Sequence, residues 1–565
     1  MFNKYLFLLL FSNCLFVLSQ AQLPFEKDFC HPLDIELELA GTFGEFRSNH
    51  LHSGLDLKTQ NKEGYNVYAA GKGYVSRIKI AANGYGNALY ITHQNGFTTV
   101  YGHLQSFNKT IQAYSRRKQY DKKSFEIDLA LSREELPVEK GDIIALSGNS
   151  GGAESPHLHF EVRDTRTEEI INPLSLGLQI KDSIAPAFEQ LLLYPFYQGS
   201  VNESPLPYTC KLNKAKDVYT VKESIYAQGL VGFGVSAIDM GVRNENRNGF
   251  YTLDFYVNNK LLLAEKYDRF AFDETRYVNG LVDFKKRVMG SGNIALSHLP
   301  LMTKIPVVKV YAGKGLIEVL PDKVYNCLII CKDFSGNTSS LKFVLKGRPA
   351  MVKPLIQASP TRVFLPQTEN VFNHTYIQMH IPQGALLDTL PFEYSRSETP
   401  AKMSFSHVHH VHNIYTPLLS SYSLSIKALG LPQSLESKAL IAIVDSNKVS
   451  AQGGQFKEGW VSCKTKSFGD FIIVVDTIPP LIKPLFKKIE SSTQEIKIKV
   501  TDELSGIRSY QLTVDGEWEL LEYDAKTSTF THQLPAGLKP GKHLAEFIFT
   551  DQKNNISQYR VEFFR

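Results

Sequence analysis

The chain has 565 residues, too many for one compact core, and this length predicts roughly three to five domains. Hydrophobic residues make up 43% and charged residues 21%, the balance of a soluble globular protein, and the many Phe and Tyr favour strands over helices. A formal net charge of +5 is too small to indicate a nucleic-acid partner, although it is compatible with weak attraction to an anionic envelope polymer.

Residues 1–21 have the pattern of a secretory signal peptide. Lys4 precedes a short apolar run, and Ser19 and Ala21 are small residues at the two positions that a signal peptidase reads. The run is too short and too interrupted for a membrane anchor, and apolar residues follow Cys14 where a mature lipoprotein would become polar. No later segment approaches the ~20 apolar residues that span a bilayer. We therefore expect cleavage after Ala21, export to the periplasm or the medium, and no transmembrane segment in the mature chain.

Cleavage there would leave five cysteines, an odd and sparse set that does not predict a disulfide framework. Cys327 and Cys331 have the spacing of a metal half-site, but no second half-site follows them. They lie in the apolar run 325–331, which is typical of a buried strand. We therefore interpret both as core thiols.

Residues 22–180 are predicted to form one domain made mostly of strands. Four strand-like runs lie between residues 67 and 101, separated by Gly- and Asn-rich turns. A polar, charged stretch over about 105–137 interrupts this pattern, and we interpret it as an insertion that carries a short helix. It would form either one wall of a groove or a solvated surface loop.

Two later segments, 183–347 and 477–565, look like diverged copies of one β module. They open on similar linkers, Asp182-Ser-Ile-Ala-Pro and Asp476-Thr-Ile-Pro-Pro. Both copies also close on an apolar strand that meets an Asp and then an Asn- or Gly-rich turn. Such content is typical of immunoglobulin-like sandwiches. The intervening residues 350–475 are predicted to form a β module of uncertain type.

Five residues of the first domain stand out for their metal and proton chemistry. His157 and His159 lie two apart in a predicted strand, so both side chains point to one face. His52 and Asp56 are able to complete a metal site with them, because the glycine between lets the backbone bend. Two His and one carboxylate are enough protein ligands for catalytic zinc, and the remaining histidines, His103 among them, could act as a base or hold an oxyanion. Each motif is weak by itself, since a lone His-x-His is more often structural.

The order of the surrounding motifs adds a much more specific signal. Five segments follow one another as in a known enzyme family: residues 41–47 (GTFGEFR), 84–93 (GYGNALYITH), 99–104 (TVYGHL), 138–151 (VEKGDIIALSGNSG) and 156–163 (PHLHFEVR). The region from 41 to about 176 thus resembles the lysostaphin/LytM-type zinc metallopeptidases. Members of that family cut peptide bonds in peptidoglycan stems or cross-bridges. Their fold is a compact, mostly antiparallel β structure with zinc in an open groove.

The resemblance implies a role for each of the five residues. His52, Asp56 and His159 would bind one Zn²⁺ ion, and His103 and His157 would line the catalytic centre. We assign His157 as the general base and His103 as the oxyanion stabiliser, although these two roles could be exchanged.

Two further sets of histidines compete with this assignment. His50 lies two residues before His52, but only His52 has the His-x-Gly-x-Asp spacing that leads to Asp56. The densest histidine cluster, at 407–412, has no carboxylate close by in sequence and no family motif around it, so metal binding there is not favoured.

The sequence therefore predicts a mainly β chain: a compact antiparallel metallopeptidase domain followed by two or three β-sandwich modules. The expected function is zinc-dependent hydrolysis of stem-peptide cross-links in peptidoglycan, above all D,D-bonds, for cell-wall remodelling. The later modules could bind envelope proteins. Two alternatives stay open: a non-catalytic LytM-like regulator of another wall hydrolase, and an envelope endopeptidase that acts on proteins. Degenerate regulators usually lack some site residues, whereas all five are present here.

Overall fold

The computed structural model describes residues 29–241, 246–349, 359–398, 404–446, 448–490, 492–535 and 537–565. The predicted signal peptide, residues 1–21, lies outside these ranges. Within them strands far outnumber helices, which confirms the mainly β fold class. In the same ranges no helix is long and apolar enough to cross a membrane.

The first domain, which we define as residues 29–180, is built on an antiparallel sheet. Its strands are β1 (Leu39–Gly41), β2 (Leu55–Lys58), β3 (Asn66–Tyr68), β4 (Gly73–Ile80), β5 (Asn87–His93), β6 (Phe97–Leu104), β7 (Ser106–Phe107), β8 (Ile127–Ala130), β9 (Pro137–Val138), β10 (Ile143–Leu146), β11 (His157–Asp164) and β12 (Ile170–Ile171). The main sheet runs β1-β2-β11-β6-β5-β4-β8, and β3-β10-β7 form a smaller one. The nearly fully buried β6 and β11 therefore lie at its centre.

The predicted insertion carries helix α2 (Lys109–Lys122), so the expected short helix is confirmed. Its Lys, Gln and Arg residues favour helix formation. The Asn108 side chain caps the first turn by accepting a hydrogen bond from the amide of Ile111, and Lys123 ends the helix in the left-handed conformation.

The second β module, residues 183–347, forms a twelve-stranded sheet around the long strands β13 and β17. Its elements are β13 (Ala187–Val201), β14 (Tyr208–Cys210), β15 (Leu212–Ala215), β16 (Val218–Val221), β17 (Ile225–Ile238), β18 (Thr252–Val257), β19 (Lys260–Lys266), β20 (Arg269–Phe270), α3 (Val278–Leu281), α4 (Phe284–Val288), β21 (Ala295–Leu296), β22 (Val308–Val310), β23 (Ile317–Val319), β24 (Val324–Lys332) and β25 (Thr338–Gly347). Strand β24 contains the predicted buried run, with Cys327 and Cys331 as buried free thiols.

The first domain and the second β module share one continuous hydrophobic core. Strand β20 of the second module pairs with β12 and so extends the sheet of the first domain. Phe43 of the first domain stacks on Phe270 of the second module, with ring centroids 4.7 Å apart. The linker at 182–186 thus joins two parts that are packed as one body.

The third β module, residues 359–476, consists of two five-stranded sheets and a short pair of strands. Its strands are β26 (Arg362–Phe364), β27 (Asn370–His374), β28 (Ile377–Ile381), β29 (Leu390–Phe392), β30 (Tyr394–Ser397), β31 (Val408–Val411), β32 (Tyr422–Lys427), β33 (Ala439–Asp445), β34 (Lys448–Gly453), β35 (Gln455–Lys457), β36 (Trp460–Thr465) and β37 (Gly469–Val475). The histidine cluster lies on and beside β31. Its members have separate partners: His409 contacts the Tyr394 hydroxyl, and His410 contacts Asp470. They form none of the metal-ligand groups found among the described residues.

The last β module, residues 477–565, pairs two four-stranded sheets. Its strands are β38 (Leu481–Pro484), β39 (Glu495–Thr501), β40 (Ile507–Val514), β41 (Glu517–Glu519), β42 (Glu522–Asp524), β43 (Thr529–Gln533), β44 (Lys542–Asp551) and β45 (Ile556–Phe564). A separate core of aliphatic and aromatic side chains fills the space between the sheets.

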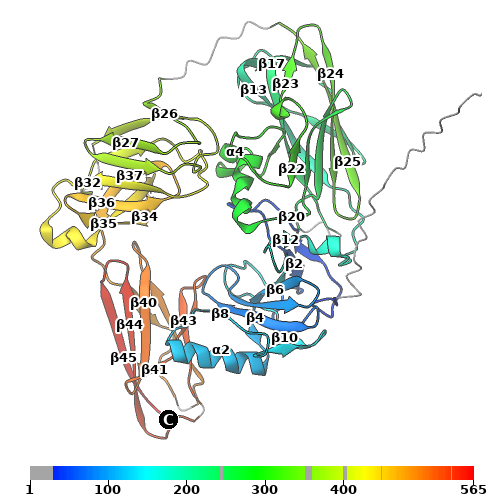
Figure 1. Cartoon of the computed structure of the whole chain (residues 1–565). Helices are drawn as coiled ribbons and strands as arrows, with labels where there is room; N and C mark the ends of the chain where they lie inside the picture. The colour runs from blue at the N-terminus through cyan, green and yellow to red at the C-terminus, as the bar shows by residue number, and fades with distance from the viewer. Residues whose placement is uncertain are drawn as a thin grey trace, which may run out of the picture.

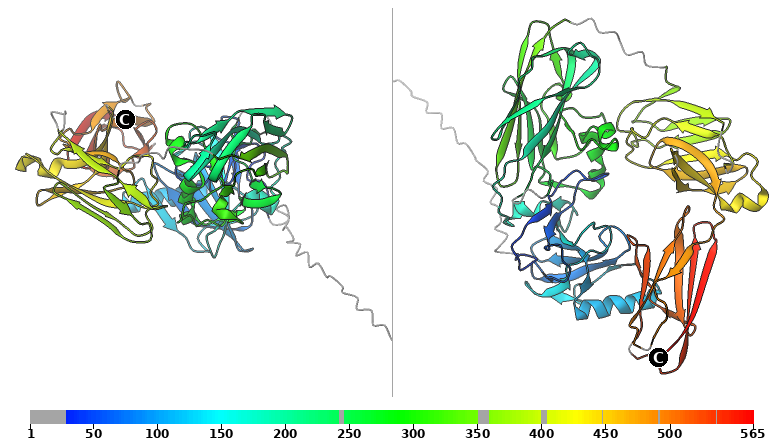
Figure 2. Two further views of the ribbon diagram at one scale, coloured as in Figure 1. Left: turned by 90° about the horizontal axis from the view of Figure 1, so that it is seen from above. Right: turned by 180° about the vertical axis from the view of Figure 1, so that it is seen from behind.

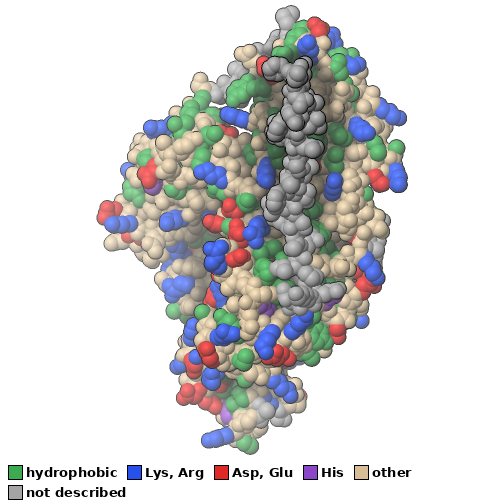
Figure 3. Space-filling view, turned by 45° about the vertical axis from the view of Figure 1, so that its right-hand side comes forward, with side chains coloured by type: hydrophobic (Ala, Val, Ile, Leu, Met, Phe, Trp, Pro, Cys, Tyr) green, Lys and Arg blue, Asp and Glu red, His purple; other side chains and the backbone are tan. Residues whose placement is uncertain are grey.

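The four parts close into a ring, because the last β module packs back against helix α2 of the first domain (Figures 1 and 2). Tyr120 meets Trp518 edge to face at 5.3 Å, and Arg116 forms an ion pair of 2.8 Å with Glu522. On the face shown in Figure 3, basic and acidic side chains are interspersed. The insertion is therefore a docking surface for the chain's own last module and not a free loop.

Candidate metal centre and active site

Three neighbouring strands bring the predicted site residues together. Asp56 on β2 lies opposite His159 on β11, and His159 lies opposite Gly102 on β6, directly before His103. His52 precedes β2, where its carbonyl accepts a hydrogen bond from the amide of Gly44. Antiparallel pairing thus joins groups that are up to 107 residues apart in sequence.

His52, Asp56 and His159 form a tight group of potential metal ligands. His52 Nε2 lies 3.1 Å from Asp56 Oδ1 and 3.1 Å from His159 Nδ1, which is 3.0 Å from Asp56 Oδ1. Tetrahedral ligands at zinc distances are ~3.3 Å from one another, close to these separations. All three residues are buried, whereas His50 is exposed and lies outside the group. Two imidazole nitrogens and one carboxylate oxygen at this spacing fit zinc.

Backbone and carboxylate acceptors fix the two histidine rings of this group. The ring of His52 donates from Nδ1 to the carbonyl of Thr42 at 2.8 Å, which leaves Nε2 with its lone pair toward the group. The ring of His159 donates from Nε2 to Glu161 at 2.9 Å, which leaves Nδ1 facing Asp56. Such partners hold a ligand ring in the tautomer and orientation that a metal requires.

Glu161 is fully buried, and its carboxylate is the centre of a network of hydrogen bonds and an ion pair. Arg163 pairs with it at 2.6 Å, and the hydroxyls of Ser53 and Tyr85 both donate to its Oε1. Burial opposes ionisation of Glu161, but Arg163 and the hydrogen bond with His159 outweigh it and hold the pKa of Glu161 below its usual range. The Tyr85 ring also stacks on the His159 ring at 4.9 Å. The network gives His159 a charged acceptor that stays ionised.

The carboxylate of Asp56 contacts Arg47 and three histidines of the site. Its Oδ2 pairs with Arg47 at 2.9 Å, so Oδ1 is left for the group described above. Burial disfavours its charge, but the proximity of His52 and hydrogen bonds with His157 and His159 keep its pKa well below the usual value. The carboxylate is thus ready to act as an anionic ligand.

The rings of His103 and His157 lie against each other beside this group, edge to face, with centroids 4.8 Å apart. Each ring is held by a backbone carbonyl: His103 donates from Nδ1 to Ser150, and His157 from Nδ1 to Ser155. In this tautomer each Nε2 has a lone pair that can accept a proton. Nε2 of His157 lies 3.3 Å from Asp56 Oδ1 and donates to this carboxylate once it carries the proton. Burial and the neighbouring histidines lower the pKa of His103 to about 3, so its ring is neutral at physiological pH.

His103 adopts a left-handed backbone conformation with φ of 59°. Residues with a Cβ adopt this region rarely, although His, Asn and Asp do so more often than most, and it costs about 1–2 kcal/mol. Its amide donates to the carbonyl of Tyr85, which holds the residue in place. Strain of this kind clusters at functional sites, where it aims a side chain that an ordinary strand would not.

The sequence motifs did not single out the residues that support the site. Glu161 was visible within the segment 156–163, two positions after His159 and so on the same face of the strand. Arg47 and Tyr85 also lie in quoted motifs, but only the tertiary structure places them against Asp56 and Glu161.

Comparison with known proteins agrees with this geometry. Residues 50–121 match Peptidase family M23, and residues 361–476 match the Zu5-like domain. DD-carboxypeptidase/endopeptidase Mpg of Neisseria meningitidis serogroup B is 31% identical over 128 residues, which are 23% of this chain and 23% of Mpg. An uncharacterized metalloprotease of Haemophilus influenzae is 27% identical over 154 residues, 26% of this chain and 27% of the relative. The chain thus matches about a quarter of the length of these relatives.

Solved structures resemble a similar share of the chain. The catalytic domain of lysostaphin from Staphylococcus simulans is 20% identical, with 25% of this chain and 90% of that chain covered and a TM-score of 0.18. A zinc-containing peptidase from Vibrio cholerae is 24% identical, with 27% and 41% covered and a TM-score of 0.20.

Proposed function

We propose that this chain, whose first domain is a family M23 peptidase domain, is a zinc-dependent endopeptidase that hydrolyses peptide bonds of bacterial peptidoglycan. The observation that carries the proposal is the convergence of His52 Nε2, Asp56 Oδ1 and His159 Nδ1 beside a second pair of histidines. Such a centre suits hydrolysis, because it combines three protein ligands with two groups able to exchange protons.

In this proposal His52, Asp56 and His159 hold the zinc ion. Zinc in such a site supplies Lewis acidity, which polarises a carbonyl and acidifies a water molecule. Arg47 and Glu161 support the ligands through Asp56 and His159. Their ion pairs and hydrogen bonds keep both ligand atoms aimed at one point.

His157 and His103 act on the substrate from the open side of the centre. The Nε2 atom of His157 lies nearest the ligand group and accepts a proton from the attacking water, while the Ser155 carbonyl stabilises the resulting imidazolium. The Nδ1–H of His103 is bound to the Ser150 carbonyl, so this ring donates to the developing oxyanion from Nε2 only in its imidazolium form. The proton then passes to the leaving amine.

The relatives support peptidoglycan as the substrate class. Mpg is named a DD-carboxypeptidase/endopeptidase, so stem-peptide cross-links with a D,D-bond are the substrate we propose. Enzymes of this kind meet their substrate in the envelope, which places the proposed site of action in the periplasm or outside the cell. The later β modules would position the catalytic domain there, with envelope proteins as their candidate partners.

Digestion of intact sacculi by the purified chain tests the proposal. Reactions with a chelator, with zinc added back and with the His159→Ala variant run in parallel, and mass spectrometry identifies the released fragments. We expect cross-linked dimers to fall to monomers only with zinc and with His159 intact. A chain that binds zinc yet leaves several wall types uncut would be a regulator or a protein-directed peptidase instead.

A further inference from the structure

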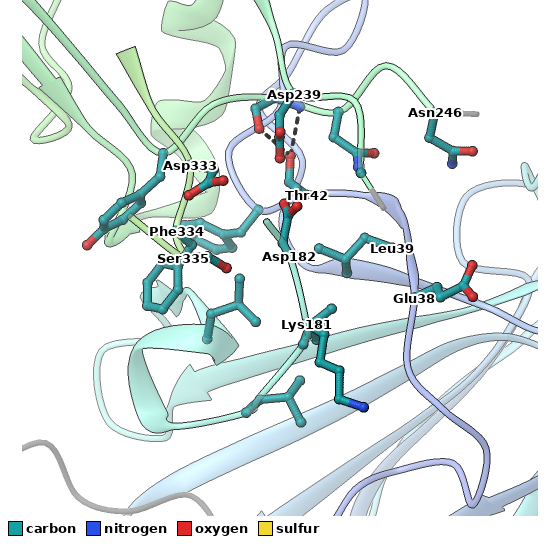
Figure 4. A pocket seen from close by; sticks show the side chains of 18 of the residues that line it. Glu38, Leu39, Thr42, Lys181, Asp182, Asp239, Asn246, Asp333, Phe334 and Ser335 are labelled. Atoms are coloured by element: carbon teal, nitrogen blue, oxygen red, sulfur yellow. Dashed lines mark hydrogen bonds between the residues drawn. The ribbon is translucent and has the colours of Figure 1, made fainter. Parts of the chain in front are cut away.

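Three aspartates meet at the junction of the first domain and the second β module, in a cavity that none of the predicted metal-binding or catalytic residues lines. Asp182 lies in the linker before β13, Asp239 directly after β17 and Asp333 directly after β24. One carboxylate oxygen of each lies within 4.8 Å of the others. Figure 4 shows the three carboxylates turned toward a common space in a cavity of about 410 Å³.

Two buried oxygen atoms of this cavity lack a partner among the described residues. Asp239 is 4% exposed, and its Oδ1 makes no hydrogen bond. Asn248, whose backbone pairs with that of Asp239, is 2% exposed, and its Oδ1 is equally unpartnered. Buried oxygens of this kind are costly unless a donor or a cation satisfies them. Asn248 is not part of the acidic group, so it points to a ligand independently.

Among the residues that the structure describes, no basic side chain forms an ion pair with the three carboxylates. Burial and the charges of Asp182 and Asp333 raise the pKa of Asp239 to about 8. Two lysines line the same cavity, but Lys181 pairs with Glu36 and points away from the carboxylates in Figure 4, and Lys58 faces Glu38. The three carboxylates therefore lack a positively charged partner among the described residues.

The last β module contains the same group at equivalent positions, formed by Asp476, Asp502 and Asp551. Its hydrogen bonds repeat those of the first group. Asn555 Nδ2 donates to Asp551 Oδ2 at 2.6 Å and to the carbonyl of Asp476 at 3.0 Å. In the first group Asn337 Nδ2 donates to Asp333 Oδ2 at 2.7 Å and to the carbonyl of Asp182 at 3.3 Å.

The two groups differ in a nearby lysine and in the hydrogen bonds of one carboxylate. Lys553, two positions after Asp551, is 6% exposed, and its Nζ donates to the carbonyls of Ala439 and Gly454. Burial lowers the pKa of Lys553, while the nearby Asp476 and Asp551 favour its charge. The equivalent position, two after Asp333, is Ser335. Amides of Leu504 and Gly506 also satisfy Asp502 Oδ1, whereas Asp239 Oδ1 has no partner. The copy in the last module thus has a buried lysine nearby and a hydrogen-bonded Asp502, whereas the copy in the second module has neither feature at the equivalent positions.

We propose that Asp182, Asp239 and Asp333 bind a calcium ion at the junction of the first domain and the second β module. Calcium takes oxygen ligands at 2.3–2.6 Å, so opposite ligands lie about 5 Å apart, which accommodates carboxylate oxygens within 4.8 Å of one another. Its irregular shell of six to eight oxygens admits the amide oxygen of Asn248 and water from the open cavity. Magnesium fits less well, because it is usually bound through one or two carboxylates and keeps several waters, whereas three carboxylates meet here.

Calcium titration of the zinc-loaded full chain in calcium-free buffer tests the proposal. Calorimetry with CaCl₂ is expected to show one ion per chain, bound with a Kd on the order of 10⁻³ M or tighter. Asp239→Asn and Ser335→Lys are each expected to weaken binding at least tenfold, the latter because it places the lysine of the last module beside the first group. Asp502→Asn is the matched control and should bind like the wild type.

Thermal unfolding separates loss of the site from loss of the fold. Calcium at ten times its Kd should raise the melting temperature of the wild type and of Asp502→Asn by a few degrees and leave Asp239→Asn unmoved. In calcium-free buffer Asp239→Asn should melt no lower than the wild type, since it removes repulsion among buried carboxylates. Absence of calcium binding, equal binding by Asp239→Asn, loss of binding in Asp502→Asn, or tighter binding of MgCl₂ would each overturn the assignment.

Discussion

Glu161 accepts a hydrogen bond of 2.9 Å from Nε2 of His159, two residues before it on the same face of β11. The contact decides which ring nitrogen of His159 faces Asp56. Because Glu161 is fully buried and paired with Arg163, it cannot exchange this partner for water.

Glu161→Gln should therefore weaken zinc binding by about 10- to 100-fold, since the neutral amide holds the His159 ring less firmly. It should also lower the free energy of unfolding by about 3–5 kcal/mol, because Arg163 loses its buried counter-charge. Chelator competition measures the first effect and denaturant unfolding the second. Glu168→Gln, at an exposed carboxylate 4.0 Å from Arg163, should change neither. Equal zinc affinity in the two variants would show that Glu161 does not orient the ligand.

Substituting the two histidines of β11 one at a time should separate metal binding from proton transfer. His159→Ala is expected to reduce the zinc content of the purified chain from about one ion to near zero, because Asp56 and His52 alone form an incomplete site. His157→Ala should keep its zinc, since the His157 ring is bound to Ser155 and lies outside the ligand group. Elemental analysis after dialysis measures both. A zinc-free His157→Ala chain would exchange the two assignments.

Alanine substitutions of His103 and of His157 should have different effects on the pH dependence of kcat. His157→Ala is expected to lower kcat by about 10²–10⁴-fold and to remove the acidic limb of the profile, as loss of a general base does. His103→Ala should lower kcat by about 10²–10³-fold but keep that limb, because His103, with a pKa lowered to about 3, does not titrate in the assay range. The reverse pattern would make His103 the base.

The proposed calcium site should make stability depend on pH. Asp239 faces the carboxylates of Asp182 and Asp333, and its folded pKa of about 8 lies above its ordinary value of 3.8. The folded state thus keeps a proton that the unfolded state loses, so this contribution is complete below pH ~4 and disappears as the pH rises toward 8. Calcium-free wild type should lose stability over this range more steeply than Asp239→Asn.

The affinity for calcium should change in the opposite sense. Since the ion must displace the proton on Asp239, apparent affinity is expected to rise with pH up to about 8 and then level off. Calorimetry in two buffers of different ionisation enthalpy measures the released proton at pH 7. A pH-independent affinity would exclude Asp239 as a ligand.

Contacts from the last β module should influence the active site. Lys526 donates to the carbonyls of Asn149 and Ala153, which flank the Ser150 carbonyl that holds the His103 ring. Lys526→Ala should loosen this loop and lower kcat roughly tenfold, because small displacements of catalytic groups are costly. Zinc content should not change.

The surface variant Lys542→Ala is a suitable control, because Lys542 forms only an exposed pair with Glu562 on the same module. It should leave kcat unchanged. If Lys526→Ala raised activity instead, the last module would restrain the enzyme and not support it.

Most of the correct predictions came from local patterns in the sequence. The strands around the site have buried, β-branched or aromatic residues between clear turns, and His157 and His159 fall at strand spacing. The polar insertion was rich in helix formers, which explains the confirmed helix α2. The structure brings together all five residues that the motifs singled out.

The features that the sequence did not predict depend mostly on long-range packing. No local sequence pattern predicted that β20 extends the sheet of the first domain or that Trp518 packs against Tyr120. These contacts join segments that are distant in sequence. The left-handed conformation of His103 was equally hidden, because a strand pattern does not predict a positive φ at one position. The two linkers at Asp182 and Asp476 were recognised as similar, but only the fold showed that each belongs to a group of three carboxylates.

The contact between the last β module and helix α2 joins two segments of one chain, so the entropy cost of association is smaller there than between separate proteins. A tethered partner is present at an effective concentration that reaches the millimolar range, whatever the dilution of the molecule. An aromatic pair and a few polar contacts, too weak to sustain a bimolecular complex, can then keep the surfaces together most of the time. That face of the first domain is thus already occupied, and a substrate of the proposed reaction must approach from elsewhere.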